Sequence, residues 1–540
     1  MKLRSFFSIL AVVVVALVSV GAIGAYWIAA SRPVPVVQPI ATQPTGTMFV
    51  SRQAPLMASL LINPDRLDAG VGGMTISPSL PGRLRRLQES LFGKVGFDYD
   101  RDLKPWLGDE VTAAITTADL DRDETNGLQP GYLTVLSVQD ADGAREAMQR
   151  FWRRSGLKDR VTESFAGVEI SAVDRGENSF ASALVGDQYV LLANSPKVIR
   201  EALNGVQVPE LSLEQNERYQ QAIERFAGKK VGFVFANLPD AVAWRWIQGW
   251  VGSDRELAAD GVEDSLAIAL KPVAQGLVAE AELFLSQGKL KSVPAEPLDL
   301  AEIRSFVPNG SRFAIVAANL EQTWQRWQNS GLVEADQLKN PRMLQWGLEP
   351  ETLFEWAQGN FVLAESAGTD RTQSNWLFVT ERSTATDAGI EQLNQRAQQQ
   401  GLSLGSFKLG DQTIYAWTKL VTTKSVGSPN LTSLQTQVQG VHTAIDQYEV
   451  FATALESLGL ALATRTADSE ISDLQVAAAQ IGSTDGYLYL SQDGLQAIWQ
   501  GVPMQAVVQQ AMGVRSAVLS RNIQDPEGWQ GTVVLFLEGN

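Results

Sequence analysis

The chain carries two copies of one pattern, and this internal similarity constrains its architecture more than any other feature. Four short motifs recur in the same order: Asp187–Tyr189 as Asp446–Tyr448, Leu103–Trp106 as Leu353–Trp356, Val231–Phe235 as Asp485–Tyr489, and Leu283–Leu285 as Leu535–Leu537. The offsets between the paired motifs stay within 250 to 259 residues. Any one pair is weak, but the ordered set indicates a tandem duplication.

The secondary-structure patterns of the two copies agree. Residues rich in β-branched and aromatic side chains predict strands at Val111–Thr117 and Tyr132–Val138, and at Phe361–Glu365 and Trp376–Thr380 in the second copy. A helix with apolar residues at intervals of three and four follows each pair, capped by Asp140 or Asp387 and ended by Gly156 or Gly401. Strands and helices without strict alternation predict the α+β class, in which two tandem units have antiparallel or mixed sheets with helices packed on a face.

These patterns divide the chain into five parts. They are a cytoplasmic tip and transmembrane signal-anchor at 1–32, a Pro-rich linker at 33–47, a first α+β repeat at 48–286, a connection at 287–297 and a second α+β repeat at 298–540.

The opening segment predicts an anchor and an orientation. Phe6–Ala30 carries no charge and is long enough to cross a bilayer as a helix, although small residues near its end leave cleavage as a signal peptide open. Lys2 and Arg4 precede it, so the positive-inside rule places the N-terminus in the cytoplasm. We therefore expect a single-pass membrane protein with most of the chain in the periplasm or the thylakoid lumen.

Composition excludes several chemistries. The chain has 60 acidic against 44 basic residues, a formal net charge of −16, which disfavours nucleic acid as a partner. It has no cysteine and one histidine, His442, so thiol nucleophiles, iron–sulfur clusters and zinc sites built from cysteine and several histidines are excluded. We expect no cofactor and no metal.

One short segment matches the sequence pattern of a hydrolase active site. Gly401-Leu-Ser403-Leu-Gly405 fits a nucleophile elbow, and Asp411 and His442 follow in the order of a catalytic triad. The elbow needs a strand before the serine and a helix after it, whereas the pattern here is the reverse. We therefore predict no catalytic residues and place His442 at an exposed strand position.

Aromatic and basic clusters are the candidate contact residues. Trp246 and Trp250 share one face of a predicted helix that also carries Trp244, and Trp324 and Trp327 share a face of another. Packing in the core is the more common role of such tryptophans. The more specific hypothesis is a partner-binding surface, because tryptophan is enriched at binding hot spots. The basic cluster of Arg83, Arg85 and Arg86 is either a solvated helix face or a contact for an acidic partner.

The start of the first repeat resembles a known family. The segment Met48–Leu56 is followed by Leu60–Leu67, and a cationic N-terminus, an apolar anchor and a Pro-rich spacer precede both. This arrangement is similar to that of cyanobacterial membrane-anchored proteins catalogued as a domain of unknown function. The resemblance covers nearly the whole chain. It implies a photosynthetic bacterial source and an extracytoplasmic setting, but no activity and no functional residues.

Three hypotheses about function follow. The first is a non-catalytic module that binds or scaffolds envelope or thylakoid proteins. The second is a carboxylate-dependent hydrolase of cell-wall material, which needs two carboxylates about 5–10 Å apart in an open cleft. The third is a carrier of an apolar ligand, which needs a large hydrophobic cavity.

Overall fold

The computed structural model describes a defined part of the chain. It covers residues 43–63, 99–122, 129–154, 159–173, 179–228, 230–237, 263–273, 276–285, 299–323, 356, 358–367, 374–424, 432–465, 472–482, 484, 486–499, 514–522 and 528–537.

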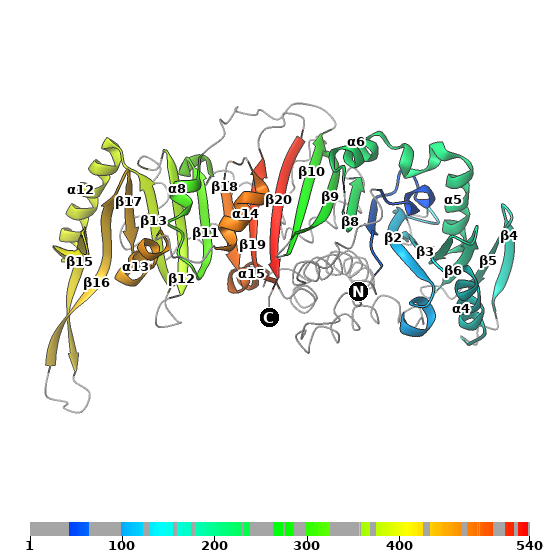
Figure 1. The fold of residues 1–540 in the computed structure, drawn as a ribbon, viewed down its shortest axis with the longest axis horizontal. Helices are drawn as coiled ribbons and strands as arrows, with labels where there is room; N and C mark the ends of the chain where they lie inside the picture. The colour runs from blue at the N-terminus through cyan, green and yellow to red at the C-terminus, as the bar shows by residue number, and fades with distance from the viewer. Residues whose placement is uncertain are drawn as a thin grey trace. The chain divides into compact units, whose positions relative to one another are not determined.

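The described strands belong to one antiparallel sheet of 20 strands, and the helices are few (Figure 1). The predicted α+β class is therefore wrong: the described chain is mostly sheet. Long hairpins account for the difference. Each half ends in a pair of strands of nine to eleven residues, and the hairpin of β15 and β16 contains strands of 13 and 14 residues.

Ten strands are described in the first half of the chain. They are β1 (Leu56–Leu60), β2 (Leu107–Thr117), β3 (Gly131–Val138), β4 (Val161–Phe165), β5 (Val168–Val173), β6 (Phe180–Val185), β7 (Tyr189–Ala193), β8 (Gly232–Asn237), β9 (Glu263–Val273) and β10 (Gly276–Leu285). Its helices are α4 (Ala141–Arg154), α5 (Pro196–Gln207) and α6 (Glu217–Arg225), with short helical turns η1 (Gly46–Phe49), η3 (Tyr99–Leu103), η5 (Pro209–Leu211) and η6 (Leu213–Gln215).

The second half has the same order of strands. They are β11 (Ser311–Ala318), β12 (Asn360–Ala367), β13 (Ser374–Glu381), β14 (Ser403–Leu409), β15 (Gln412–Lys424), β16 (Thr432–Ile445), β17 (Tyr448–Ala452), β18 (Gly486–Ser491), β19 (Val514–Asn522) and β20 (Gly528–Leu537). Its helices are α8 (Ala301–Arg304), α12 (Thr384–Gln399), α13 (Leu455–Thr464), α14 (Asp473–Ile481) and α15 (Gln492–Trp499).

Corresponding strands also have corresponding neighbours. In the first half β3 pairs with β2 and β7, and β5 lies between β4 and β6. In the second half β13 pairs with β12 and β17, and β15 lies between β14 and β16. The correspondence allows each position of one half to be compared with its equivalent in the other.

By its contacts the chain divides into two compact units that do not follow the sequence halves. One comprises 1–292, 501–515 and 525–540, and the other comprises 293–500 and 516–524. The C-terminal strand β20 pairs with β10 inside the first of these units, over a register from Gly276–Phe536 to Phe284–Gly528. The five parts predicted from the sequence, including the connection at 287–297, remain predictions.

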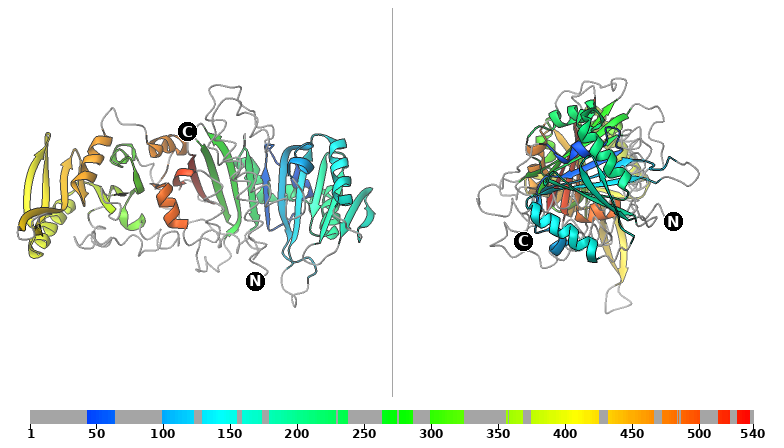
Figure 2. Two further views of the ribbon diagram at one scale, coloured as in Figure 1. Left: turned by 90° about the horizontal axis from the view of Figure 1, so that it is seen from below. Right: turned by 90° about the vertical axis from the view of Figure 1, so that its right-hand side faces the viewer.

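Helices cover both faces of the sheet in the first half. On one face α5 packs against alternate residues of the strands, including Ile170, Ala181 and Leu191. On the other face α4 contributes Trp152, whose indole Nε1 donates to Ser182 Oγ at 2.9 Å. Because Ala181 and Ser182 are neighbours in β6, their side chains point to opposite faces. The right-hand view of Figure 2 shows α4, in cyan, and α5, in green, on either side of the strands.

A buried carboxylate holds the first described residues against the sheet. Glu110, on β2, is almost fully buried and accepts hydrogen bonds from Thr45 N at 2.8 Å and Gly46 N at 2.7 Å. The hydroxyls of Thr45 and Thr112 donate to the same carboxylate at 2.6 and 2.8 Å. These four donors stabilise the charge away from water and fix the start of η1.

The described residues contain no helix that is both long and apolar enough to cross a membrane. The predicted anchor, Phe6–Ala30, lies outside the described residues.

Lys230 is completely buried just before β8, beside the ring of Phe233. Burial lowers the pKa of its ammonium group from the ordinary value of 10.5, and the charge of Lys271 lowers it further. Between the lowered pKa and 10.5 the unfolded chain binds a proton that the folded chain has released, so the free energy of unfolding rises with pH in that window.

We predict that Lys230→Met, which keeps the length of the side chain and removes the charge, raises the unfolding temperature at pH 7. The gain should shrink as the pH approaches 10, because the wild-type lysine is then neutral in the folded state. Thermal unfolding of both proteins at pH 7 and pH 10 measures this. If the unfolding temperatures of the two proteins differ by the same amount at pH 7 and pH 10, the predicted effect of burial on the Lys230 amine is wrong.

Two helical glycines provide a matched test of packing in the second half. A Cβ on Gly389, in α12, would come within 2.3 Å of the indole ring of the buried Trp356, whereas a Cβ on Gly459, in α13, would meet nothing within 4 Å. We predict that Gly389→Ala destabilises the fold by about 1–3 kcal/mol through overpacking. Gly459→Ala should instead stabilise it by about 0.5–1 kcal/mol, because alanine is the better helix former. Urea unfolding of the two variants checks both signs, and a neutral Gly389→Ala would contradict the close approach of Trp356.

Candidate functional site

The single histidine lies in the second half, on β16. His442 is only 5% exposed, so the prediction of an exposed position is wrong, although the prediction of a strand is confirmed. Its Nδ1 lies 2.6 Å from Oε1 of Glu449, which is 2% exposed on the neighbouring strand β17. Two ionisable side chains are thus paired in a buried position on one face of the sheet.

Aromatic rings surround the histidine because of the strand register. Tyr415 on β15 and Phe451 on β17 are the residues directly opposite His442, and side chains opposite one another in an antiparallel pair share a face. The ring centroids of Tyr415, Trp417 and Phe451 lie 5.0, 5.1 and 5.6 Å from that of His442, each with an interplanar angle of 21°. The stack excludes water from one of the imidazole faces and fixes the orientation of the ring.

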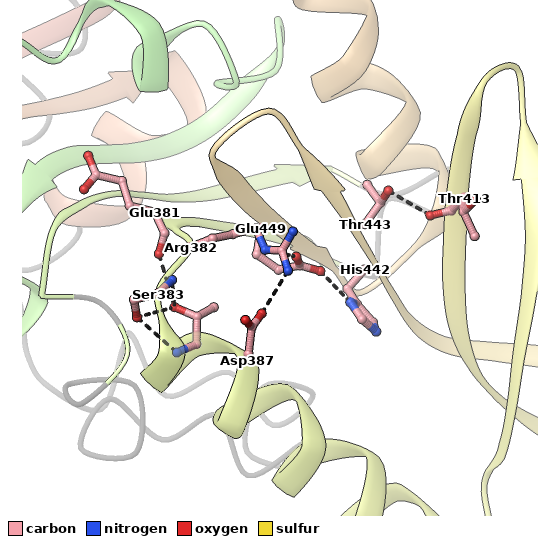
Figure 3. A network of polar contacts seen from close by, with 9 residues as sticks. Glu381, Arg382, Ser383, Asp387, Thr413, His442, Thr443 and Glu449 are labelled. Atoms are coloured by element: carbon pink, nitrogen blue, oxygen red, sulfur yellow. Dashed lines mark hydrogen bonds and ion pairs between the residues drawn. The ribbon is translucent and has the colours of Figure 1, made fainter.

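The polar network continues to the helix that covers this face. Arg382 Nε lies 3.6 Å from the second oxygen of Glu449, and Arg382 Nη2 donates to Asp387 Oδ1 at 2.9 Å (Figure 3). The hydrogen bond to Asp387 raises the pKa of the guanidinium above its usual value, and the charge of Glu449 contributes to the same shift. Arg382 therefore stays cationic and links β13, β17 and α12.

This network is a support for the fold and not an assembled hydrolase. The carboxylate that contacts His442 is Glu449, whereas Asp411 lies in the turn after β14 and Ser403 at the exposed start of β14. The triad pattern is not brought together. Among the described residues there is also no group of three or more His, Asp or Glu side chains that could hold a metal ion.

A shallow pocket lies beside the stack, between α12 and β15. Its cavity volume is only about 10 Å³, and it is lined by Leu393, Arg396, Ala397, Gln400, Leu402 and Trp417. Ligand sites for small molecules usually have volumes of roughly 300–1,000 Å³, so this pocket is below that range.

The first half has no equivalent of the buried pair. The strand registers place Ser182 at the position of His442 and Val190 at that of Glu449. Burying charge is costly unless every partner is present. The pair is therefore a feature that only the second half has, and its members depend on one another.

We predict that Glu449→Val alone lowers the free energy of unfolding by about 1–3 kcal/mol, because it leaves the Nδ1 of His442 without an acceptor or donor partner. Adding His442→Ser, so that both positions match the first half, should recover part of the loss. The double-mutant cycle is measured by urea unfolding, and a coupling energy below about 0.5 kcal/mol would show that the two side chains act independently.

The exposed surface of the second half differs more strongly from that of the first. All seven residues of β14 are exposed. Of the twelve large apolar side chains that are exposed among the described residues, seven lie on β14, β15 and β16: Leu404, Phe407, Leu409, Tyr415, Leu420, Leu434 and Val438. Exposed apolar side chains that gather in one place mark interaction sites more often than scattered ones do.

The corresponding edge of the first half is covered. There Glu163, on β4, forms an ion pair with Arg200 of α5 at 2.6 Å, and Phe165 packs against the core. The strand registers and helix starts place Phe407 and Gly459 at the positions of Glu163 and Arg200. With the ion pair absent, α13 contacts β13, β16 and β17, and the ring of Phe407 is 39% exposed.

The hairpin of β15 and β16 is also longer than its counterpart. These strands have 13 and 14 residues, whereas β5 and β6 have six each. The added part continues beyond the residues that pair with β14 and β17, and Figure 1 shows it extending past β17. On one face of it lie Leu420, Leu434 and Val438, which are 63%, 71% and 36% exposed. We call these three residues the hairpin surface.

The structure does not test the contact residues that the sequence singled out. Trp244, Trp246, Trp250, Trp324, Trp327, Arg83, Arg85 and Arg86 are all outside the described residues. Sequence reasoning missed the hairpin surface, and the signal that could have revealed it is Thr418–Thr423, a run rich in β-branched residues with no equivalent in the first half.

Comparisons with known proteins give a family without a known function. One solved structure that matches is described as "Structure of crystal form I of TP0453"; it is 9% identical, the match covers 47% of this chain and 82% of that chain, and the TM-score is 0.27. A likeness of that size does not establish a shared fold. No curated protein matches the chain. A family model described as "Protein of unknown function (DUF3352)" matches residues 10–525. The chain therefore belongs to the DUF3352 family of proteins of unknown function.

Proposed function

We propose that this protein is a non-catalytic binding or scaffold module that holds another protein through the hairpin surface. The observation that carries the proposal is the exposure of Leu420 and Leu434, 63% and 71%, on a part of the hairpin that the first half lacks. Two copies of one pattern have thus diverged by the addition of apolar, solvent-facing area.

The chemistry of the hairpin suits a protein partner. Leu420, Leu434 and Val438 are diagonal neighbours on one face, since Leu420 is opposite Thr436 and Val438 is opposite Thr418. On the same face, the polar side chains of Thr436, Thr422 and Thr418 are directly opposite Leu420, Leu434 and Val438 respectively. An apolar centre beside a polar rim is the usual composition of a protein–protein interface.

The setting of the proposed module is outside the cytoplasm. The cationic start and the uncharged segment after it are typical of exported chains. On the family resemblance, the compartment is the periplasm or the thylakoid lumen of a cyanobacterium, and the partner is an envelope or thylakoid protein. The tryptophan and arginine clusters named from the sequence remain proposed as further contact regions.

We predict that Leu420→Glu combined with Leu434→Glu abolishes capture of the partner without lowering the unfolding temperature, because both side chains are already in water. The tagged full chain is cross-linked in its native membranes, and the captured proteins are identified by mass spectrometry and rebound in purified form. Val206→Glu is the matched control, because Val206 is 39% exposed on α5 and belongs to the other compact unit.

A partner that is retained by the control and lost by the double variant supports the proposal. The proposal fails if the double variant captures and rebinds the same protein as the wild type. It also fails if no protein is captured by any variant while the purified chain cleaves cell-wall glycan.

A further inference from the structure

The outer edge of β14 has no partner strand among the described residues. Leu409 and Gln412 close a two-residue turn that begins at Gly410, whose φ of 61° suits a glycine at the first turn position. The residues of such a closing pair hydrogen-bond to each other, and the pattern alternates along the strand. The N–H and C=O groups of Leu404, Ser406 and Lys408 therefore point away from β15, where no other described strand pairs with β14.

The side chains of β14 leave this edge accessible. Its seven residues are all exposed, and on one face Phe407 and Leu409 are 39% and 42% exposed. On the same face a Cβ on Gly405 would meet nothing within 4 Å. The edge thus combines free hydrogen-bonding groups, an exposed aromatic ring and an open glycine.

We propose that β14 pairs with β14 of a second copy of this chain, antiparallel and centred on Ser406. In this register Ser406 is opposite its own copy, Phe407 is opposite Gly405, and Leu404 is opposite Lys408. The pairing extends the sheet across a twofold axis, as expected of a symmetric dimer.

The sequence of β14 fits its own copy in three respects. The register uses all seven residues, and the three outward-facing residues of each strand exchange about six hydrogen bonds. Each Phe407 ring lies over the open Gly405 of the other copy, in a pair of the type where side chains approach most closely. The two Lys408 side chains are four positions apart, about 13 Å, so no like charges stand opposite each other.

The edge of the first half is built differently. β4 has five residues, and Glu163 within it is held by the ion pair with Arg200. Short strands and charged side chains are the usual means of protecting a sheet edge from pairing. β14 is longer and has lost this charge, because Phe407 stands at the position of Glu163.

The charge of the whole chain does not prevent the pairing. The net charge of −16 makes two copies repel each other at long range, but this repulsion is screened beyond about 8 Å at physiological salt. Near the contact, β14 itself carries one charged residue, Lys408, and it is basic.

A cysteine at the twofold axis tests the register directly. The chain contains no cysteine, so Ser406→Cys introduces a single thiol, and the opposed Cα atoms would be about 5.5 Å apart, which a disulfide spans. We expect the full chain in mild detergent to become mainly a disulfide-linked dimer on gentle oxidation. Thr162→Cys, an exposed position at the equivalent place on β4, is the control and should stay mainly monomeric.

A charge test separates this pairing from other modes of association. Leu404→Glu places a carboxylate opposite Lys408 of the other copy, twice in the dimer, and should strengthen self-association by roughly 2- to 30-fold. Leu404→Lys should weaken it by a similar factor. Sedimentation of the full chain without the added cysteine measures both, and association through the apolar opening segment would respond to neither.

The proposal is overturned if Ser406→Cys cross-links no more than Thr162→Cys, or if it cross-links to another protein instead of its copy. It is also overturned if the two substitutions at Leu404 shift the association equally. The hairpin variants Leu420→Glu and Leu434→Glu lie outside this register and should leave the dimer intact, so self-pairing and partner binding succeed or fail separately.

Discussion

Backbone hydrogen bonding between antiparallel neighbours is the interaction on which the described structure depends. Most described strands have a partner strand on both sides, whereas β4 and β14 pair on one side alone. Helices are secondary to this arrangement: α4 and α5 cover the faces of a sheet that the strand ladders hold together. Among the described strands, edges without a partner strand therefore lie at β4, at β14 and along the part of the β15–β16 hairpin beyond Thr418 and Val441.

The equivalent edge strands β4 and β14 differ in how far they are protected from pairing. The Glu163–Arg200 pair joins β4 to the helix above it, and a short strand leaves little edge to pair. In the second half the same two positions hold Phe407 and Gly459, which cannot form that bridge. The duplicated pattern thus keeps its ladders, since those are needed for folding, while the side chains at the edge are free to change. Divergence in a duplicated sheet is expected where a substitution costs the least, and that is at the edge and on the hairpin.

Local features were predictable from the sequence, whereas the lengths of the strands were not. Trp106 and Trp356 mark equivalent buried positions, and the recurring Asp-Gln-Tyr motif is explained by Asp187 and Asp446, whose φ angles of 55° and 54° place both in the left-handed region that aspartate tolerates. Gly401 ends α12 with a φ of 77°, as predicted. Each of these depends on neighbours a few residues away in sequence.

The errors arise where distant residues decide the outcome. The N-cap of α12 is Ser383, whose side chain accepts from Thr386 N, and the predicted cap Asp387 instead lies in the first turn and binds Arg382. His442 is buried because Tyr415 and Phe451 flank it on adjacent strands, a register that no local pattern shows.

The buried His442–Glu449 pair and the exposed hairpin surface are connected through the strands β15 and β16. His442 and Glu449 fix β16 to β17, and the stacked ring of Tyr415 fixes β15 beside them. A hairpin that extends into solvent has no packing of its own to hold its direction, so its base must be rigid if its tip is to present Leu420 and Leu434 in one orientation. A buried polar pair has a specific geometry, which apolar contacts lack, and such pairs are retained in some proteins for that specificity in spite of their desolvation cost. On this argument the His442–Glu449 pair at the base of the hairpin and the exposed apolar residues on its extended part belong together, since both are features of the second half alone.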